Sequence, residues 1–274
     1  MTEQLPTVFH ITHWKAGSQW VYGVLLACAP ERVIKPKLKI AHFYEDVIYP
    51  GKIYPTVYTP RNRFEETVWP SNVSMDASHP PSPQDPPAVQ NFYNFGVLKH
   101  PVKIFVVIRD LRDALVSLYF SLKVSHPIIS DQVAEGHRIL NQIQTEEEGL
   151  LFVIGERGQA SANIQKSWLN VRKSGEALYL RYEDLIANEQ EEFAKIVDYC
   201  RIDVSRSKLT GIVNENSFNK RSGRKPGQED VSSHYRKGVS GDWKSHFTDR
   251  IKKEFKDKFG QLLIDTGYEK DLNW

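Results

Sequence analysis

Residues 102–108 (Val-Lys-Ile-Phe-Val-Val-Ile) form an almost continuously apolar run that stops at Arg109-Asp110. A strand this apolar must be covered on both faces, which is typical of the strands of a parallel sheet. Leucines then recur at helical spacing, at positions 111, 115, 118 and 122. A buried strand that leads directly into a helix is the repeating unit of a parallel α/β fold.

Two further segments repeat this arrangement. The β-branched run 7–12 is followed by an apolar helical run at 20–29, and the short strand 177–180 is followed by a helix at about 189–200. We therefore predict one α/β domain over residues 1–274, with a central, mostly parallel sheet flanked by helices. Ligands are expected at the carboxyl ends of the strands.

Residues 44–98 show no such periodicity. They are rich in aromatic side chains, and five prolines fall between Pro80 and Pro87, which is too dense for a regular element. We predict an irregular loop region laid over the sheet, not a separate domain. The polar run 217–233 leads into a basic block, and we predict a ligand-binding loop over residues 217–244.

Composition limits the classes of function. A net charge of +2 over 274 residues argues against a surface that coats nucleic acid, so any anion recognition has to be local. The two cysteines have no partner at metal-ligand spacing and form no disulfide framework. No stretch approaches the roughly 20 apolar residues that span a bilayer. We expect a soluble cytoplasmic protein that inserts into no membrane.

Four segments carry residues suited to an anionic ligand. Residues 15–20 (Lys-Ala-Gly-Ser-Gln-Trp) join a strand to a helix, where free helix N–H groups and a lysine favour an anion. The loop is no Walker A loop, because it lacks the Gly-Lys-[Ser/Thr] spacing. Arg109 ends a strand, and Ser117 lies two helical turns later, off the leucine stripe. The two side chains together suit a second phosphate.

The third and fourth segments lie in the second half of the chain. Tyr182 follows a strand, and Ser217-Phe218 adds an aromatic face, which suits a purine ring. In Arg236-Lys237-Gly238, a planar guanidinium and a compact ammonium lie beside a glycine, and the glycine lets the backbone approach a ligand.

In this order, the four segments resemble the cytosolic-type sulfotransferases that use 3′-phosphoadenosine 5′-phosphosulfate (PAPS). The family's first loop, Tyr-Pro-Lys-Ser-Gly-Thr-Thr-Trp, corresponds to residues 13–20. Its arginine and serine, eight residues apart, match Arg109 and Ser117, and its Tyr-Glu-Asp matches residues 182–184. Its Arg-Lys-Gly-x-x-Gly-Asp-Trp-Lys matches residues 236–244 at every fixed position.

The resemblance implies a donor site for PAPS, with 3′-phosphoadenosine 5′-phosphate (PAP) as the product. The residues implied to hold the 5′-phosphosulfate are Lys15, Ala16, Gly17, Ser18, Gln19 and Trp20, with Lys15 also stabilising the leaving oxygen. Those implied at the 3′-phosphate are Arg109, Ser117, Arg236, Lys237 and Gly238. Those implied at the adenine are Trp20, Tyr182 and Phe218, with Ser217 beside them.

The family's catalytic base lies between the second strand of its sheet and the strand that bears the arginine, and His79 occupies that interval here. The implied reaction is in-line displacement, in which His79 deprotonates the acceptor and Lys15 neutralises the leaving phosphate. No metal is implied. Ala77 stands where many relatives carry a lysine, and Asp249 and Lys253 break the family's dimer motif, so dimerisation by that route is not expected.

The sequence leaves two alternative functions open. One is a non-catalytic module that binds PAP or PAPS, and the other is a kinase on a similar scaffold, which would need the missing Walker A loop. The expected partner is the hydroxyl group of an alcohol, phenol or sugar. The aromatic segment 44–69 and residues 125–158 are expected to wall that pocket. Arg61 and Arg63 would favour an acidic acceptor.

Overall fold

The computed structural model describes residues 4–37, 41–73 and 80–274. Its centre is one parallel sheet with the strand order β2-β1-β3-β4. The strands are β1 (Thr7–Thr12), β2 (Ile53–Val57), β3 (Val102–Ile108) and β4 (Leu178–Arg181). The predicted α/β class, with a single domain and a parallel sheet flanked by helices, is confirmed.

Helices cover one face of the sheet because alternate strand residues are apolar on that side. Val8, Phe105 and Leu180 pack there with apolar residues of the covering helices in one buried cluster. The helices on this face are α1 (Ser18–Cys28), α9 (Tyr182–Ala187), α10 (Glu189–Tyr199) and α11 (Arg206–Asn216).

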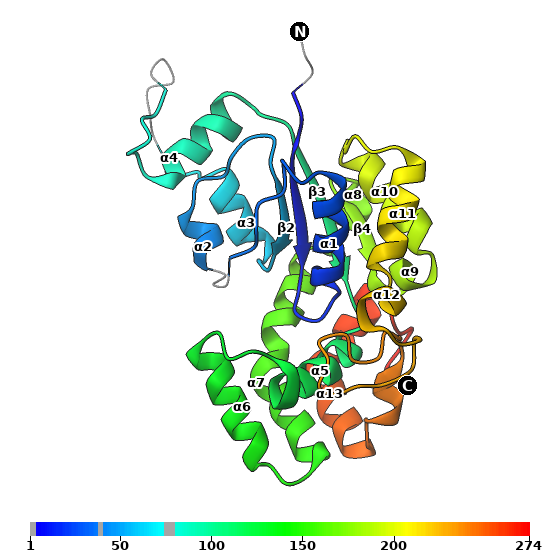
Figure 1. Cartoon of the computed structure of the whole chain (residues 1–274). Helices are drawn as coiled ribbons and strands as arrows, with labels where there is room; N and C mark the ends of the chain where they lie inside the picture. Colours follow the sequence, from blue (N-terminus) through cyan, green and yellow to red (C-terminus); the bar gives the residue numbers. More distant parts are fainter. Residues whose placement is uncertain (1–3, 38–40, 74–79) are drawn as a thin grey trace.

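The opposite face is covered by other parts of the chain. Phe9, Val106 and Ile108 point into a second cluster, which also contains Trp168. The elements that contribute to it are α3 (Arg61–Val68), the π-helix η1 (Phe92–Val97), the end of α7 (Glu146–Ser167) and α8 (Val171–Ser174). Two short helices, α2 (Ala41–Glu45) and α4 (Pro87–Asn91), lie at this outer side (Figure 1).

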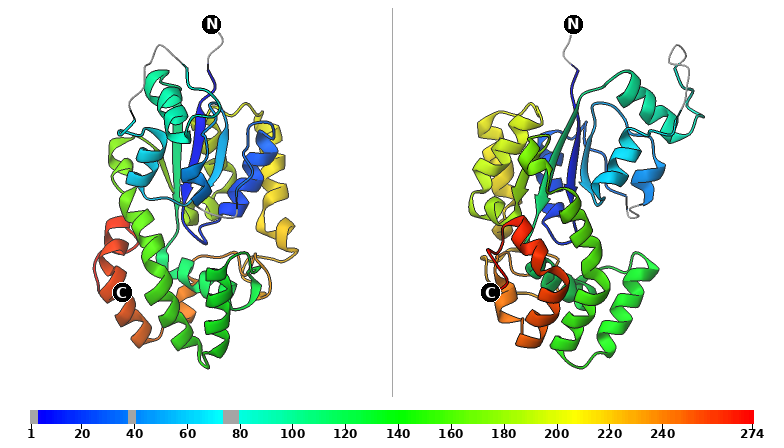
Figure 2. Two further views of the ribbon diagram at one scale, coloured as in Figure 1. Left: turned by 90° about the vertical axis from the view of Figure 1, so that its left-hand side faces the viewer. Right: turned by 180° about the vertical axis from the view of Figure 1, so that it is seen from behind.

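A separate group of helices stands beyond the carboxyl ends of the strands (Figures 1 and 2). It has its own apolar cluster, built around Leu115, Ile154, Trp243 and Phe255. Its elements are α5 (Leu111–Phe120), the π-helix η2 (Ser121–Ser125), α6 (Asp131–Gln142), most of α7, η3 (Asp242–Ser245) and α13 (Asp249–Thr266). The long helix α7 joins this group to the sheet, since its last turns pack in the second cluster.

The prediction that residues 44–98 are irregular was wrong in part. The segment supplies β2, α3, α4 and η1. Ile53 and Val57 are buried, so alternate residues of β2 face the core. Pro55 lies within this strand, where a missing N–H is tolerated because β2 is at the edge of the sheet. Among the described helices, none is long and apolar enough to cross a membrane.

Candidate functional site

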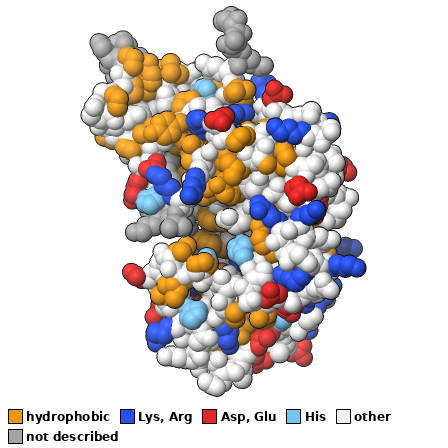
Figure 3. All heavy atoms as spheres, in the orientation of Figure 1, with side chains coloured by type: hydrophobic (Ala, Val, Ile, Leu, Met, Phe, Trp, Pro, Cys, Tyr) orange, Lys and Arg blue, Asp and Glu red, His pale blue; other side chains and the backbone are white. Residues whose placement is uncertain are grey.

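A cavity of about 1220 Å³ opens between the carboxyl ends of the strands and the helical group. Figure 3 shows this face of the molecule hollowed near its middle, with histidine side chains at the rim. Most of the residues predicted from the sequence line it. They are Lys15, Gly17, Ser18, Gln19, Trp20, Arg109, Ser117, Tyr182, Phe218, Arg236, Lys237 and Gly238.

Two predicted residues do not line the cavity, and a third lies outside the part of the chain that the structure describes. Ala16 is fully buried beneath its loop and does not line the cavity. Ser217 precedes the short helix α12 (Phe218–Ser222), and its carbonyl accepts a hydrogen bond from the N–H of Arg221. His79, the predicted base, lies outside the described residues, as does Ala77.

The loop between β1 and α1 turns sharply. Lys15 and Gly17 both adopt positive φ, at 66° and 82°. A Cβ atom at Gly17 would come within 2.8 Å of the Tyr182 ring, so only glycine fits there without displacing that ring. No side chain caps the N-terminus of α1, which leaves its first N–H groups available to a ligand. Ser18 Oγ and Tyr58 Oη are 2.7 Å apart.

Lys15 projects from this loop toward the helical group. Its Nζ donates to Ser121 Oγ over 3.3 Å. Burial, followed by the charges of Arg109 and Arg236, lowers the pKa of Lys15 to about 8. The ammonium is therefore poorly compensated in the free protein, and an anion in the cavity would stabilise its charged form.

Arg109 contacts three segments of the cavity wall. Its guanidinium donates to the carbonyl oxygens of Lys15, at 3.0 Å, and of Val239, at 3.2 Å. It also lies over the Tyr182 ring, 4.5 Å from the ring centre. One arginine at the end of β3 thus contacts the first loop, the third segment and the basic block.

Two hydrogen bonds fix the backbone of Arg109. Its N–H donates to His13 Nε2 over 3.1 Å, and its carbonyl accepts from Gln165 Nε2 at 2.9 Å. Burial lowers the pKa of His13 to about 4, so this ring is neutral and its Nε2 is free to accept. These contacts hold the ends of β1 and β3 against α7.

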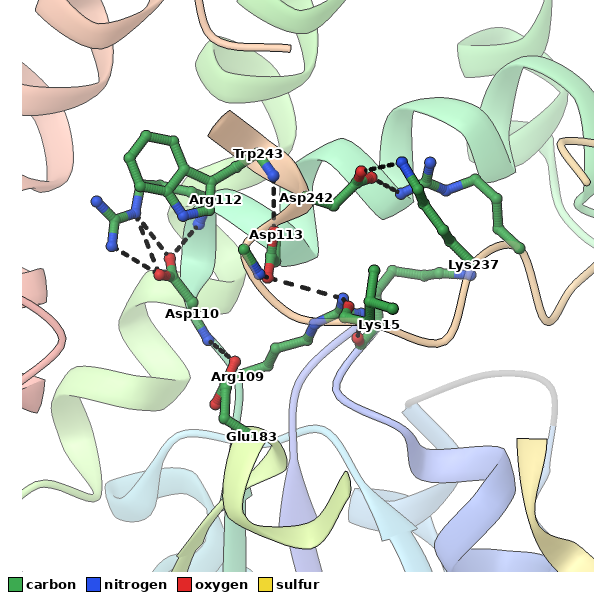
Figure 4. Close-up of polar contacts among 12 residues, drawn as sticks. Lys15, Arg109, Asp110, Arg112, Asp113, Glu183, Lys237, Asp242 and Trp243 are labelled. Atoms are coloured by element: carbon green, nitrogen blue, oxygen red, sulfur yellow. Dashed lines mark hydrogen bonds and ion pairs between the residues drawn. The ribbon is translucent and has the colours of Figure 1, made fainter. Parts of the chain in front are cut away.

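The two cations of the basic block are already paired with carboxylates. Arg236 forms ion pairs with Glu229 and Asp242, and Lys237 Nζ lies 2.5 Å from Asp242 Oδ1 (Figure 4). Asp242 is nearly inaccessible, whereas a third of the Glu229 side chain is exposed. Although burial by itself raises the pKa of Asp242, hydrogen bonds from His246, Lys237 and Arg236 hold it far below its usual range.

Asp113 anchors the same block to α5. Its carboxylate accepts the N–H of Gly241 at 2.6 Å and that of Trp243 at 2.9 Å; Figure 4 shows the contact between Asp113 and Trp243. Gly238 has a φ of 66°, and a Cβ atom there would lie 2.6 Å from Phe218 Cε2. The backbone of the block therefore packs directly on the aromatic ring predicted to contact adenine.

Several donors that belong to cavity-lining residues have no partner among the described residues. They are Arg109 Nε, Arg236 Nε and Trp20 Nε1, all of them buried. Buried N–H groups without acceptors are costly, so these atoms fit a ligand that brings acceptor oxygens or ring nitrogens. A doubly phosphorylated nucleotide brings both. No group of three or more acidic, histidine or cysteine side chains suited to a metal ion occurs in the described part of the chain.

Other parts of the cavity wall come from residues 34–37 and 42–48, from β2 and from the residues around η2 and α6. They include the apolar side chains Phe43, Ile48, Val57 and Ile129. Arg61 and Arg63 do not line it. Arg61 pairs with Glu65 and Glu176, and Arg63 lies over the Tyr44 ring, so neither side chain is placed to favour an acidic acceptor.

Sequence reasoning assigned no role to other residues at the site, among them Asp113, Glu229 and Asp242. Tyr58 and His126 line the cavity and fall within the segments 44–69 and 125–158 that were expected to wall the acceptor pocket, although neither was singled out. Asp242 carried a signal, since it is a fixed position of the basic block. Tyr58 follows β2, a strand that the aromatic and proline-rich composition of residues 44–98 concealed. The others come from separate elements whose approach no local pattern encodes.

The comparisons with known proteins agree on one family. A sequence model described as "Sulfotransferase domain" matches residues 6–267. Mouse sulfotransferase 1 family member D1 is 28% identical over 182 residues, covering 61% of this chain and 57% of that protein. Rat sulfotransferase 1A1 is 25% identical over 187 residues, covering 64% and 60%. The matched segments thus span less than two thirds of these relatives.

Solved structures agree in fold. Mouse sulfotransferase SULT7A1, crystallised with PAP, superposes with a TM-score of 0.62 at 17% identity and covers 95% of this chain and 85% of its own. Retinol dehydratase, crystallised with retinol and PAP, gives a TM-score of 0.50 at 16% identity, with 96% and 82% covered. At these identities the two structures establish the shared fold.

Proposed function

Because this chain belongs to the sulfotransferase domain family, we propose that it is a PAPS-dependent sulfotransferase. It transfers the sulfuryl group of PAPS to a hydroxyl group of a small molecule or saccharide by in-line displacement, and PAP is the product. The protein works as an enzyme of the cytoplasm, as its sulfotransferase relatives suggest.

One observation carries this proposal. Lys15, Arg109 and Arg236 come from three distant segments and line a single cavity. Buried N–H donors of Arg109, Arg236 and Trp20 point to a ligand with acceptors, since none has a partner among the described residues. PAP bound to two structural relatives supports a nucleotide with separate 5′ and 3′ phosphates as that ligand.

The roles follow from position. Lys15 and the uncapped N–H groups of α1, with Gly17 and Ser18, hold the 5′-phosphosulfate and neutralise charge that develops on the leaving oxygen. Arg109, Ser117, Arg236, Lys237 and Gly238 hold the 3′-phosphate. Trp20, Tyr182 and Phe218 surround the adenine. Positioning and electrostatics supply most of the rate, as in phosphoryl transfer.

The acceptor must lose its proton as the new S–O bond forms. The base predicted from the sequence is His79, and that prediction stands untested because the residue lies outside the described part of the chain.

Thermal unfolding with nucleotides tests the donor site. PAP at about 100 times its dissociation constant should stabilise the protein by about 2.7 kcal/mol, whereas ATP with Mg²⁺ should not. Arg236→Ala should weaken PAP binding by about 30-fold or more, as expected when one partner of a buried charge pair is truncated at a cost of about 2–5 kcal/mol. Stabilisation by ATP–Mg²⁺ alone would favour the kinase alternative.

Transfer of labelled sulfate from PAPS to a panel of alcohols, phenols and saccharides tests the chemistry. Turnover of one acceptor establishes the enzyme and names its acceptor class. PAP binding without turnover of any acceptor or of PAPS itself would instead indicate a non-catalytic PAP-binding module.

A further inference from the structure

A histidine that the sequence did not single out faces the same cavity. We propose that His126 is the general base that deprotonates the acceptor, an inference that rests on the proposed sulfuryl transfer. His126 follows η2 and lines the cavity together with Lys15 and Ser18.

Two hydrogen bonds place His126 beside the leaving-group lysine. Its backbone N–H donates to the carbonyl oxygen of Ser121 at 2.7 Å, which closes the π-helical turn. The hydroxyl of the same serine accepts from Lys15 Nζ at 3.3 Å. These contacts fix the backbone of His126 to Ser121, the residue whose hydroxyl meets Lys15, and the His126 side chain lines the same cavity.

The ring itself is in the form that a base requires. His126 Nδ1 is fully buried and has no hydrogen-bond partner within the described residues, so an acceptor in the cavity would meet this ring at Nε2. Burial, then the charge of Lys15, lowers the pKa of His126 below its usual value, so the ring is neutral near pH 7 and carries a free lone pair. The second titratable group near it is His234, whose pKa is lowered to about 4, chiefly by burial, so that ring is also neutral.

Binding of the donor would adjust the basicity of this histidine. Burial is the main cause of the lowered pKa of His126 and the charge of Lys15 is the second, and the negative phosphosulfate offsets that second cause. The pKa of His126 then rises toward neutrality when PAPS is bound, close to the value best suited to a base at working pH.

The proposed step moves one proton to His126 and one sulfuryl group to the acceptor. His126 takes the proton of the acceptor hydroxyl as the acceptor oxygen bonds to sulfur. The bond between sulfur and the bridging oxygen breaks, its electron pair stays on the 5′-phosphate of PAP, and imidazolium later releases its proton to water.

Other histidines at the cavity fit less well. His42 lies on α2, and no hydrogen bond within the described residues links it to Lys15 or Ser121. His234 lies in the loop before the basic block, and burial lowers its pKa to about 4, which is too low for an effective base near neutral pH.

Three variants test the proposal with labelled PAPS, using the acceptor panel and water as acceptors. His126→Ala and His126→Asn should lose about 100-fold or more in kcat, the contribution of a positioned base. PAP binding and the melting temperature should remain near wild type. His137→Ala is the matched control, because His137 lies on α6 outside the cavity and contacts only Asn141 among the described residues.

Two results would overturn the proposal. The first is wild-type kcat in both His126 variants, in which case a loss in His79→Ala would assign the base there. The second comes from NMR titration of the imidazole, which needs no acceptor: the pKa of His126 should start below 6.5 and rise when PAP is added, and no change on saturation with PAP would contradict it. Failure of PAP to bind wild type would instead refute the proposed function.

Discussion

Single residues at the donor end of the cavity are organised as cations held by carboxylates. Arg236 and Lys237 share Asp242, and Arg236 also reaches Glu229. Asp113 accepts from the backbone N–H groups of Gly241 and Trp243 and also lies 4.0 Å from the Arg109 guanidinium. Lys15 differs from these cations, since its contact is to the hydroxyl of Ser121 and burial lowers its pKa. The charge of Lys15 is therefore lost as the pH rises past about 8.

PAP binding should weaken above pH 8. Lys15 has a pKa of about 8 in the free protein, so it is charged below that pH and neutral above it, and phosphate attraction fades as pH rises. Linkage allows a loss of up to about tenfold per pH unit beyond the pKa. Calorimetric titration with PAP from pH 6.5 to 9.5 measures this. Lys15→Arg, which stays charged, should show a flatter profile, and equal profiles would contradict the assignment.

Glu229 should compete with the 3′-phosphate for Arg236. It is the more exposed of the two carboxylates on that guanidinium, and a partly exposed pair contributes about 1 kcal/mol or less. Glu229→Gln should therefore tighten PAP binding by up to about fivefold. Asp242→Asn should weaken binding, because the buried Asp242 positions both cations. If Glu229→Gln also weakened binding, Glu229 would be a positioning residue.

At the scale of elements, the segment after α12 behaves as a closed loop. Arg224 donates to the carbonyl oxygens of Tyr235, at 2.5 Å, and of Arg236, at 2.8 Å. Backbone bonds join Gly227 to Lys237 and Asp230 to Arg236. These contacts hold the basic block next to Phe218 in the shape that its two glycines permit.

Gly238→Ala should damage this loop more than Gly223→Ala does. Both glycines have positive φ, 66° and 70°, so both substitutions cost about 1–2 kcal/mol in backbone strain. A Cβ atom at Gly238 would also overlap the Phe218 ring, whereas nothing lies within 4 Å at Gly223. Both variants should lose a few degrees of melting temperature, and only Gly238→Ala should also lose PAP affinity. Equal affinities would show that Phe218 adjusts freely.

Over the whole molecule, α7 connects the two halves that enclose the cavity. Leu150 and Val153 pack in the helical cluster, whereas Ile164 belongs to the cluster under the sheet. Trp168, just past its end, donates to the carbonyl oxygen of Thr59 at 3.0 Å. A helix shared by two cores couples their stability, so we expect the halves to unfold together.

Two glycines of α7 provide the test. A Cβ atom at Gly158 would lie 2.7 Å from Phe259 Cε2, whereas nothing lies within 4 Å of one at Gly155. Gly158→Ala should destabilise the fold by about 1–3 kcal/mol through overpacking, and Gly155→Ala should stabilise it by about 0.5–1 kcal/mol through helix propensity. Urea unfolding followed by circular dichroism and by tryptophan fluorescence measures both. Non-coincident transitions would show that the halves unfold separately.

The sequence by itself determined the fold class and most of the residues that line the proposed donor side of the cavity. Strands β1, β3 and β4 and their helices are encoded locally, by apolar runs that end at polar turns. The predicted cofactor residues follow those strand ends, and parallel strands bring their carboxyl ends to one edge. Most of these residues therefore meet in one cavity, although Ala16 and Ser217 do not line it.

Only the tertiary structure decided the acceptor side and the state of the charges. β2 was hidden because an edge strand can carry a proline, and its burial depends on pairing with β1. The pairing of Arg236 with Glu229, the meeting of Lys15 with Ser121 and the approach of His126 join residues from different elements. Such contacts depend on how the helical group docks against the sheet, and no spacing along the chain records that docking.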